Sequence, residues 1–151
     1  MNFETAYMQL YIELGESKKM VLSTCLKNIV TSRMMSIIIL DKKFYFQTDK
    51  NFRKYRQLKE NPNISLCIDN IQIEGQCKEL GKPCDQMEFV EAYKKNFPSS
   101  FTRYTLLKNE RLFVVIPTFI ERWKYVDGDP YIEIFDVINK RYSFTHYVGE
   151  L

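Results

Sequence analysis

Hydrophobic and polar positions alternate with two different periods along this chain, and the helical period occurs in only three places. Apolar residues recur every three or four positions from Phe3 to Leu14, and Gly15 follows as an end signal, which predicts an amphipathic helix. A second helical pattern opens at Pro83 and continues to about Phe97, where Pro98 breaks it. The side of this helix expected to face the core carries Met87, Val90, Tyr93 and Phe97.

The third helical segment is short and continues to about Glu60. Asn51 is placed to cap its first turn, because an asparagine side chain can accept a hydrogen bond from the free N–H groups there. Asn61-Pro62 ends it, because the residue before a proline is pushed out of the helical conformation. Residues 99–110 show neither period and are expected to form an irregular segment.

Strand-like alternation fills most of the remaining sequence. The expected strands are Lys19–Leu26, Ser32–Leu40, Lys43–Thr48, Ile64–Ile68, Ile71–Cys77, Arg111–Val126, Tyr131–Asp136 and Arg141–Val148. Pro117 lies inside the longest strand and indicates an edge or a bulge, because proline has no N–H to donate. Most links between the strands are short, and short links force antiparallel neighbours. We therefore predict a mainly β fold, a small antiparallel β-barrel with attached helices, in one domain that spans residues 1–151.

Composition narrows the functional classes. The net charge of +3 is too balanced to indicate a nucleic-acid partner by its field alone. No apolar run is long enough to span a membrane, and the N-terminus lacks a secretory pattern, so we expect a cytoplasmic protein. The four cysteines have no metal-binding spacing and are expected to be free thiols, and no metal site is predicted.

Familiar catalytic and nucleotide-binding motifs are absent from the sequence. His146 is the only histidine, and no Gly-x-Ser-x-Gly elbow accompanies it, so a serine or cysteine triad is not expected. The chain has neither a Walker loop nor a Gly-x-Gly-x-x-Gly sequence. Phosphate binding without a glycine-rich loop remains open.

Two cations, Arg53 and Lys54, occupy the first turn of the short helix. A helix N-terminus is already positive, so cations there cost a few tenths of a kcal/mol each unless an anion offsets them. A phosphate is the natural anion, and the alternative is that both side chains project into solvent. The segment from Lys50 to Lys59 also interleaves basic residues with Phe52 and Tyr55, which could grip a single nucleic-acid strand. The competing interpretation turns Phe52, Tyr55 and Leu58 toward the core.

Five sequence segments in this order resemble the FMN-binding split-barrel superfamily, which includes pyridoxamine 5′-phosphate oxidase and relatives of the general stress and nitroimidazole-resistance types. The segments are Arg33-Met-Met, Phe44-Tyr-Phe-Gln-Thr48, Phe52-Arg-Lys54, Asn61-Pro62 and Ile73-Glu-Gly75. A sixth, Ile120-Glu-Arg-Trp123, resembles the segment that places a tryptophan near the flavin. The resemblance implies an antiparallel split β-barrel that binds FMN.

The resemblance also implies a set of cofactor residues. Arg33, Arg53 and Lys54 would neutralise the FMN phosphate. The residues implied to line the ribityl chain and the ring are Met34, Met35, Ser36, Gln47 and Thr48. Asn70 would hydrogen-bond the ring, and Trp123 would pack on it across the interface of a homodimer, since the family builds its site from two subunits. No catalytic side chain is assigned.

Departures from the oxidase pattern bear on the substrate. The oxidase has a lysine that contacts both cofactor and pyridoxamine phosphate where this chain has Ile38, and its C-terminal Arg-Leu-x-Pro segment is missing here. Oxidation of pyridoxamine phosphate is therefore not expected. The leading hypothesis is an FMN-dependent oxidoreductase with an unidentified small-molecule substrate and reduced nicotinamide as a candidate donor. The alternatives are a non-enzymatic flavin- or haem-binding store or sensor, and a barrel that binds single-stranded nucleic acid.

Overall fold

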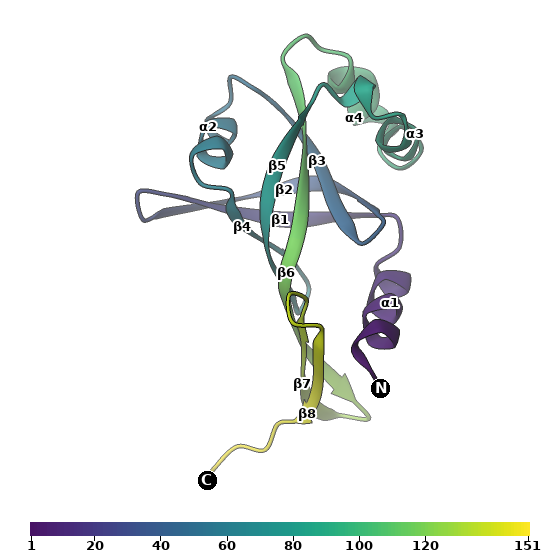
Figure 1. Ribbon diagram of the computed structural model, residues 1–151, viewed down its shortest axis with the longest axis vertical. Helices are drawn as coiled ribbons and strands as arrows, with labels where there is room; N and C mark the ends of the chain where they lie inside the picture. Colours follow the sequence, from purple (N-terminus) through teal and green to yellow (C-terminus); the bar gives the residue numbers. More distant parts are fainter.

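The computed structural model of the protein describes residues 1–151, and strands make up most of it (Figure 1). The strands are β1 (Ser17–Leu26), β2 (Ile29–Leu40), β3 (Lys43–Asp49), β4 (Asn63–Ile68), β5 (Ile71–Gly81), β6 (Glu110–Val126), β7 (Asp129–Asp136) and β8 (Arg141–His146). The helices are α1 (Phe3–Leu14), α2 (Arg53–Glu60), α3 (Met87–Asn96) and the single turn α4 (Pro98–Ser100). A 3-10 turn (Pro83–Asp85) precedes α3, and a π-helical turn (Phe101–Thr105) follows α4.

The first six strands close into an antiparallel barrel. Their order is β3-β2-β1-β4-β5-β6, and β6 pairs back with β3 to complete the ring. The hairpin of β7 and β8 continues from β6 beyond the barrel, at the lower end in Figure 1. The predicted antiparallel barrel with attached helices is confirmed, and closure leaves no free edge within the ring.

Strand β6 joins the barrel to the hairpin. Residues 110–115 pair with β3, residues 112–122 pair with β5, and residues 119–126 pair with β7. The register shifts where Pro117 faces Gly75, so the predicted bulge is confirmed. A Cβ atom on Gly75 would lie 2.7 Å from the carbonyl oxygen of Ile116, which is why only glycine fits there.

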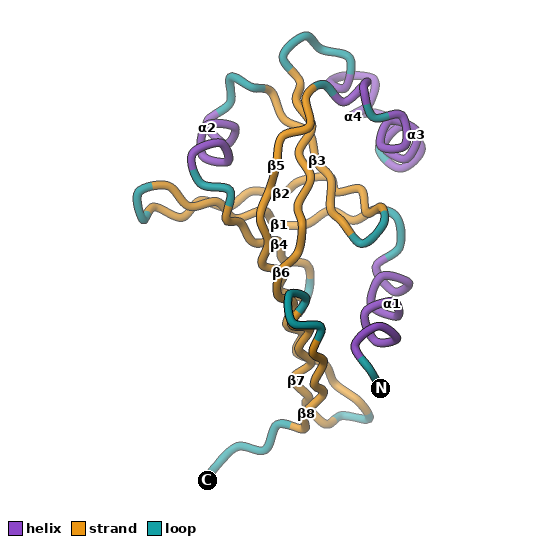
Figure 2. The backbone as a smooth tube through the Cα atoms, viewed as in Figure 1, coloured by secondary structure: helices purple, strands orange, loops and turns teal.

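Two hydrophobic clusters hold the helices to the barrel. Helix α1 contributes Leu10 and Leu14 to the main core, where they join Phe44 and Phe46 of β3. Helix α3 packs on the outside of the barrel through a second cluster, and its members are Ile38, Phe89, Ala92, Tyr93 and Leu112. Figure 2 shows α2 and α3 near the same end of the barrel, with α1 at the other. No helix is long and apolar enough to cross a membrane.

Several local predictions are wrong. Helix α3 begins at Met87 instead of Pro83, and Met87 is 60% exposed because Phe89, Ala92 and Tyr93 supply the buried side. The segment after Pro98 is expected to be irregular but begins with helical turns. Asn51 does not cap α2: its backbone N–H donates to Asp49 Oδ1 (2.7 Å) in the preceding turn, and no side chain caps the helix. The Asn51 error is local, because Phe52 occupies the N-cap position and Asn51 lies one residue before it.

Candidate functional site

A cavity of about 370 Å³, which we call the α2–α3 cavity, lies beside strands β2 and β3. The starts of α2 and β6 and the segment from α3 to the π-helical turn form the rest of its wall. Its lining residues are Met34, Met35, Ser36, Gln47, Thr48, Asp49, Phe52, Lys54, Tyr93, Ser100, Tyr104, Leu107 and Glu110. Six of the ten predicted cofactor residues belong to this set: Met34, Met35, Ser36, Gln47, Thr48 and Lys54. The predicted residues of β2, β3 and α2 therefore meet around one cavity.

The chain reaches this arrangement by a local route. Strands β2 and β3 are antiparallel neighbours joined by a tight turn, so their functional residues lie close together. The turn after β3 then feeds directly into α2, which brings the Lys54 ammonium to 3.4 Å from the hydroxyl oxygen of Thr48. The Lys54 ammonium also lies 4.9 Å from the centre of the Phe52 ring, a cation–π distance.

Arg33, Arg53 and Lys54 form a cationic cluster without a carboxylate partner. None of the three takes part in an ion pair, whereas Arg56 and Lys59 on the same helix do. Burial, and then the charge of Arg53, lowers the pKa of Arg33. Burial and the charge of Arg33 lower the pKa of Lys54, although Glu110 and Asp49 act in the opposite direction. Mutual repulsion of this kind favours a bound anion.

The Arg33 guanidinium is held rigidly beneath α2. Its Nη2 donates to Thr24 Oγ1 (3.0 Å), to Thr31 Oγ1 (2.9 Å) and to Gln57 Oε1 (3.0 Å). Its Nη1 donates to the backbone oxygen of Leu22 (3.1 Å). Arg33 does not line the α2–α3 cavity itself. Its charge is nevertheless fixed close enough to Lys54 to lower the pKa of that ammonium.

The remaining predicted residues lie at two other cavities. Arg53 lines a smaller one, of about 190 Å³, beside the turn between β1 and β2. Asn70 and Trp123 line a third, of about 340 Å³, where the turn between β4 and β5 meets β6. The backbone N–H of Trp123 donates to the backbone oxygen of Asn70 (3.2 Å), so these two residues are neighbours. Within one chain they do not share a cavity with Lys54.

The basic and aromatic stretch on α2 combines both expected arrangements. Leu58 is buried in the main core, and Tyr55 packs against that core while its hydroxyl donates to Glu79. Phe52 is 55% exposed and lines the α2–α3 cavity. The core interpretation is thus correct for Leu58 and Tyr55 and wrong for Phe52.

Sequence reasoning missed the far wall of the α2–α3 cavity. Tyr93, Ser100, Tyr104, Leu107 and Glu110 form this wall, and most of them lie in the segment that has no hydrophobic period. Glu110 is only 5% exposed. Its Oε2 accepts from Gln47 Nε2 (2.8 Å), and the Thr105 hydroxyl donates to Gln47 Oε1 (3.0 Å). Burial, and then the charge of Asp49, raises the pKa of Glu110 to about 7.

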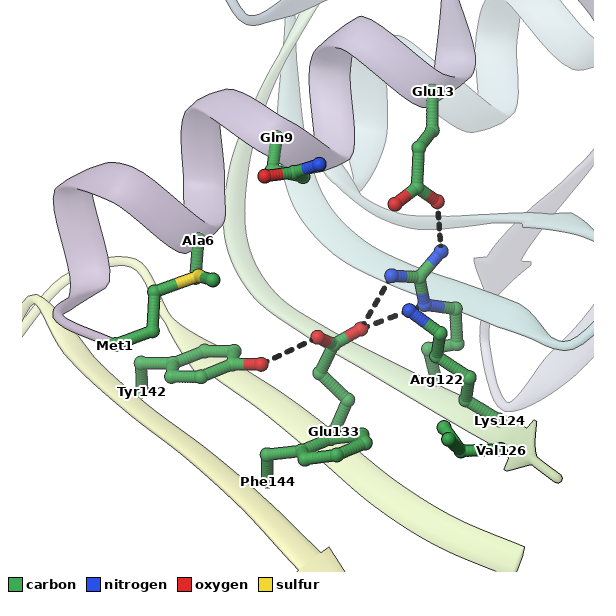
Figure 3. A pocket seen from close by; sticks show the side chains of 10 residues that line it. All are labelled: Met1, Ala6, Gln9, Glu13, Arg122, Lys124, Val126, Glu133, Tyr142 and Phe144. Carbon is green, nitrogen blue, oxygen red and sulfur yellow. Dashed lines mark hydrogen bonds and ion pairs between the residues drawn. The ribbon is translucent and has the colours of Figure 1, made fainter.

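The largest cavity, of about 590 Å³, lies elsewhere, between α1 and the strands β6 to β8 (Figure 3). The Arg122 guanidinium bridges Glu13 of α1 (2.6 Å) and Glu133 of β7 (2.6 Å), and the Tyr142 hydroxyl donates to Glu133 (2.6 Å). These charges satisfy one another, and no predicted site residue lines this cavity. The network ties α1 to the hairpin and supplies no free group for chemistry.

Comparison with known proteins places the chain in a family. A family model described as pyridoxamine 5′-phosphate oxidase matches residues 9–126. The chain belongs to this family. The pyridoxine/pyridoxamine 5′-phosphate oxidase of Ehrlichia chaffeensis is 24% identical over 161 aligned positions, which cover 83% of this chain and 77% of that protein. The matched residues include the α2–α3 cavity and all ten predicted cofactor residues, and they exclude β7 and β8.

Two solved structures have the same fold. A pyridoxamine 5′-phosphate oxidase-related, FMN binding protein from Nostoc punctiforme has a TM-score of 0.61 at 12% identity, over 97% of this chain and 93% of its own. HutZ, the heme storage protein from Vibrio cholerae, has a TM-score of 0.60 at 14% identity, over 78% of this chain and 91% of its own. The fold is therefore the antiparallel split barrel of the pyridoxamine 5′-phosphate oxidase family.

Proposed function

We propose that this member of the pyridoxamine 5′-phosphate oxidase family binds FMN in the α2–α3 cavity and acts as a flavin-dependent oxidoreductase. The cationic cluster carries the proposal: Arg33, Arg53 and Lys54 lack carboxylate partners, and Lys54 reaches the cavity. Arg33 and Lys54 are partly buried, whereas Arg53 is exposed. Partly buried cations need a counter-charge, and a phosphate monoester supplies one. The family match and the FMN binding relative from Nostoc punctiforme support the same cofactor.

In this proposal the chain binds and orients the cofactor. Lys54 presents its ammonium to the phosphate, while Arg33, held by Thr24 and Gln57, contributes a fixed charge beside it. The lining residues proposed for the ribityl chain and the ring are Met34, Met35, Ser36, Gln47 and Thr48. Bound FMN would supply hydride or electron transfer, and a reduced nicotinamide is the proposed donor.

The proposed site is shared between two copies of the chain. Asn70 and Trp123 line a different cavity from Lys54 within one chain, so they could join the cofactor only from a second copy. We therefore propose a homodimer in which Trp123 of one subunit packs on the flavin held by the other. An aromatic ring of this kind contributes about 1 kcal/mol through stacking.

Pyridoxamine phosphate is not the proposed substrate. Ile38 stands where the oxidase pattern has a lysine, and its side chain is fully buried against Phe89 and Tyr93 of α3. A lysine at this position would bury its ammonium in an apolar cluster, at a cost of several kcal/mol. The packing of α3 on Ile38 therefore supports a substrate other than pyridoxamine phosphate.

An absorption spectrum of the purified protein, with and without added FMN, tests the proposal. We expect a flavin spectrum with FMN released on denaturation, and bleaching of that spectrum by a reduced nicotinamide. A bound flavin that no nicotinamide reduces would favour a store or sensor over an enzyme. A haem spectrum with no flavin affinity would favour haem storage, the role named for HutZ.

The double variant R53A/K54A tests the phosphate site directly. We expect FMN binding to weaken by about 2 to 4 kcal/mol, because each charged hydrogen bond contributes about 1.5 to 3 kcal/mol. The matched control is K94A/K95A, which removes the same charge from the exposed side of α3. Equal affinity of the two double variants in a fluorescence titration would remove Arg53 and Lys54 from the site.

A further inference from the structure

Glu110 is the one nearly buried carboxyl group on the wall of the α2–α3 cavity. It is the first residue of β6 and lies directly opposite Asp49 in the pairing of β6 with β3. Only 5% of the residue is exposed, and no lysine or arginine lies within ion-pair distance of it. A carboxylate in this position lacks the partner that buried charges normally have.

The two carboxyl oxygens of Glu110 have different surroundings. Oε2 is fixed by the Gln47 amide, which the Thr105 hydroxyl holds in turn. No group of the chain donates to Oε1. Every fully buried side-chain oxygen and nitrogen in the protein has a hydrogen-bond partner, so an oxygen without one, such as Oε1, is not fully buried. Because Glu110 lines the α2–α3 cavity, we infer that Oε1 is accessible from that cavity. One oxygen positions the carboxyl group and the other can exchange a proton with the cavity.

The charged and titratable groups around Glu110 come from every element that faces it. They are Asp49 of β3, Lys54 of α2, Tyr93 of α3 and Tyr104 of the π-helical turn. Arg111, the next residue in β6, instead donates to the backbone oxygens of Lys108 and Glu110. With Glu110 ionised, its charge and that of Asp49 offset part of the attraction that Lys54 and the nearby Arg33 exert on an incoming anion.

We propose that Glu110 is the acid–base residue of the α2–α3 cavity, and that a phosphate-bearing ligand binds there together with one proton from solvent, held on Glu110 Oε1. This inference rests on the proposed function of the same cavity. The only covalent change is the O–H bond that forms when the Glu110 carboxylate takes up a proton from solvent as the ligand binds. A neutral Glu110 no longer opposes the attraction of the cations for the ligand and can also donate a hydrogen bond to it.

The direction of the pH effect follows from the carboxyl group. Its pKa of about 7 in the free protein rises further when an anion sits nearby. Affinity should therefore fall as pH rises above about 7, by up to tenfold for each pH unit. The phosphate of FMN has a second pKa of about 6, and its ionisation strengthens binding to cations as pH rises, which is the opposite direction.

Calorimetry and fluorescence titration of FMN between pH 6.5 and 8.5 test the inference, in two buffers of different ionisation enthalpy. For the wild type we expect uptake of up to one proton and a several-fold loss of affinity across this range. For E110Q, whose amide oxygen can still accept from Gln47, we expect no proton uptake and an affinity that stays constant or rises slightly with pH, because only the ionisation of the FMN phosphate then acts. The control E91Q removes an exposed carboxyl group from α3 and should behave as the wild type.

The outcomes separate this inference from the proposed function. FMN binding with equal proton uptake in the wild type and E110Q would overturn the role of Glu110 and leave the FMN site intact. Failure of the wild type to bind FMN or inorganic phosphate at any pH would overturn both. A carbon-13 NMR titration of the glutamate carboxyls without ligand gives a separate readout. We expect one signal that titrates near pH 7 and is missing from E110Q, and its absence from the wild type would refute the proposal.

Discussion

Gln57 and Gln47 show how single amides organise the charges of this protein. Gln57 Oε1 accepts from Arg33, Thr24 and Thr31, so one buried oxygen fixes the guanidinium beneath α2. Gln47 links Thr105 to Glu110 on the other side of the α2–α3 cavity. Neutral amides thus position one cation and one carboxyl group without neutralising the charge of either.

Glu110 also makes a prediction about stability. Its pKa is about 7 in the folded protein, compared with 4.5 for a freely exposed glutamate, so the folded state binds more protons between these pH values. Stability therefore falls as pH rises from about 4.5 to about 7. We expect E110Q to have a higher free energy of unfolding than the wild type at pH 8, by about 1 to 3 kcal/mol, because it has no charge to bury.

Urea unfolding at pH 8 and pH 5 measures this difference. At pH 5 Glu110 is largely protonated in the folded protein, so the advantage of E110Q should shrink. The exposed variant E91Q provides the reference for loss of a carboxyl group without burial. An advantage of E110Q that is equal at both pH values would show that Glu110 does not titrate in this range.

At the scale of elements, the Arg122 network ties α1 to the hairpin, alongside the packing of Tyr7 on Phe135. Arg122 and Glu133 are nearly buried, with side-chain exposures of 12% and 6%, while Glu13 is 42% exposed. Tyr142 of β8 donates to the same Glu133 carboxylate, so four elements meet at one cluster (Figure 3).

We expect Arg122→Ala to destabilise the protein by about 3 to 5 kcal/mol, because it leaves Glu133 buried without its partner. Glu13→Gln should cost less than about 1 kcal/mol, since that side of the pair is exposed. Thermal or urea unfolding measures both variants. Similar losses for the two variants would mean that Glu133 is not the residue that needs Arg122.

At the scale of the whole molecule, the proposed dimer explains why one chain separates the cofactor residues. Lys54 and Trp123 line different cavities of one chain, and in the proposed dimer Lys54 of one copy and Trp123 of the other meet at one flavin. Each subunit would then contribute its cations to one site and its Trp123 to the other.

Mixed dimers provide the test of this arrangement. We expect R53A/K54A and W123A each to bind FMN weakly, and their heterodimer to regain one intact site, because one of its two sites keeps both the cations and the tryptophan. FMN titration of the purified heterodimer measures the number of strong sites. No recovery would place the cations and Trp123 at the same site within one chain, and FMN binding of wild-type strength by the W123A homodimer would remove Trp123 from the site.

The sequence by itself determined the features that depend on residues close together in the chain. The strand pattern and the short links determined the antiparallel barrel. Residues 33–54 run continuously through β2, β3 and α2, so the predicted lining residues meet without help from distant segments. Only the tertiary structure decided the far wall of the cavity, which comes from the segment without a hydrophobic period. The Gln47–Glu110 contact joins residues 63 positions apart, and packing of α3 and closure of β6 onto β3 decide it. Local periodicity describes which face of an element is buried, whereas the charge balance of a cavity depends on which elements finally surround it.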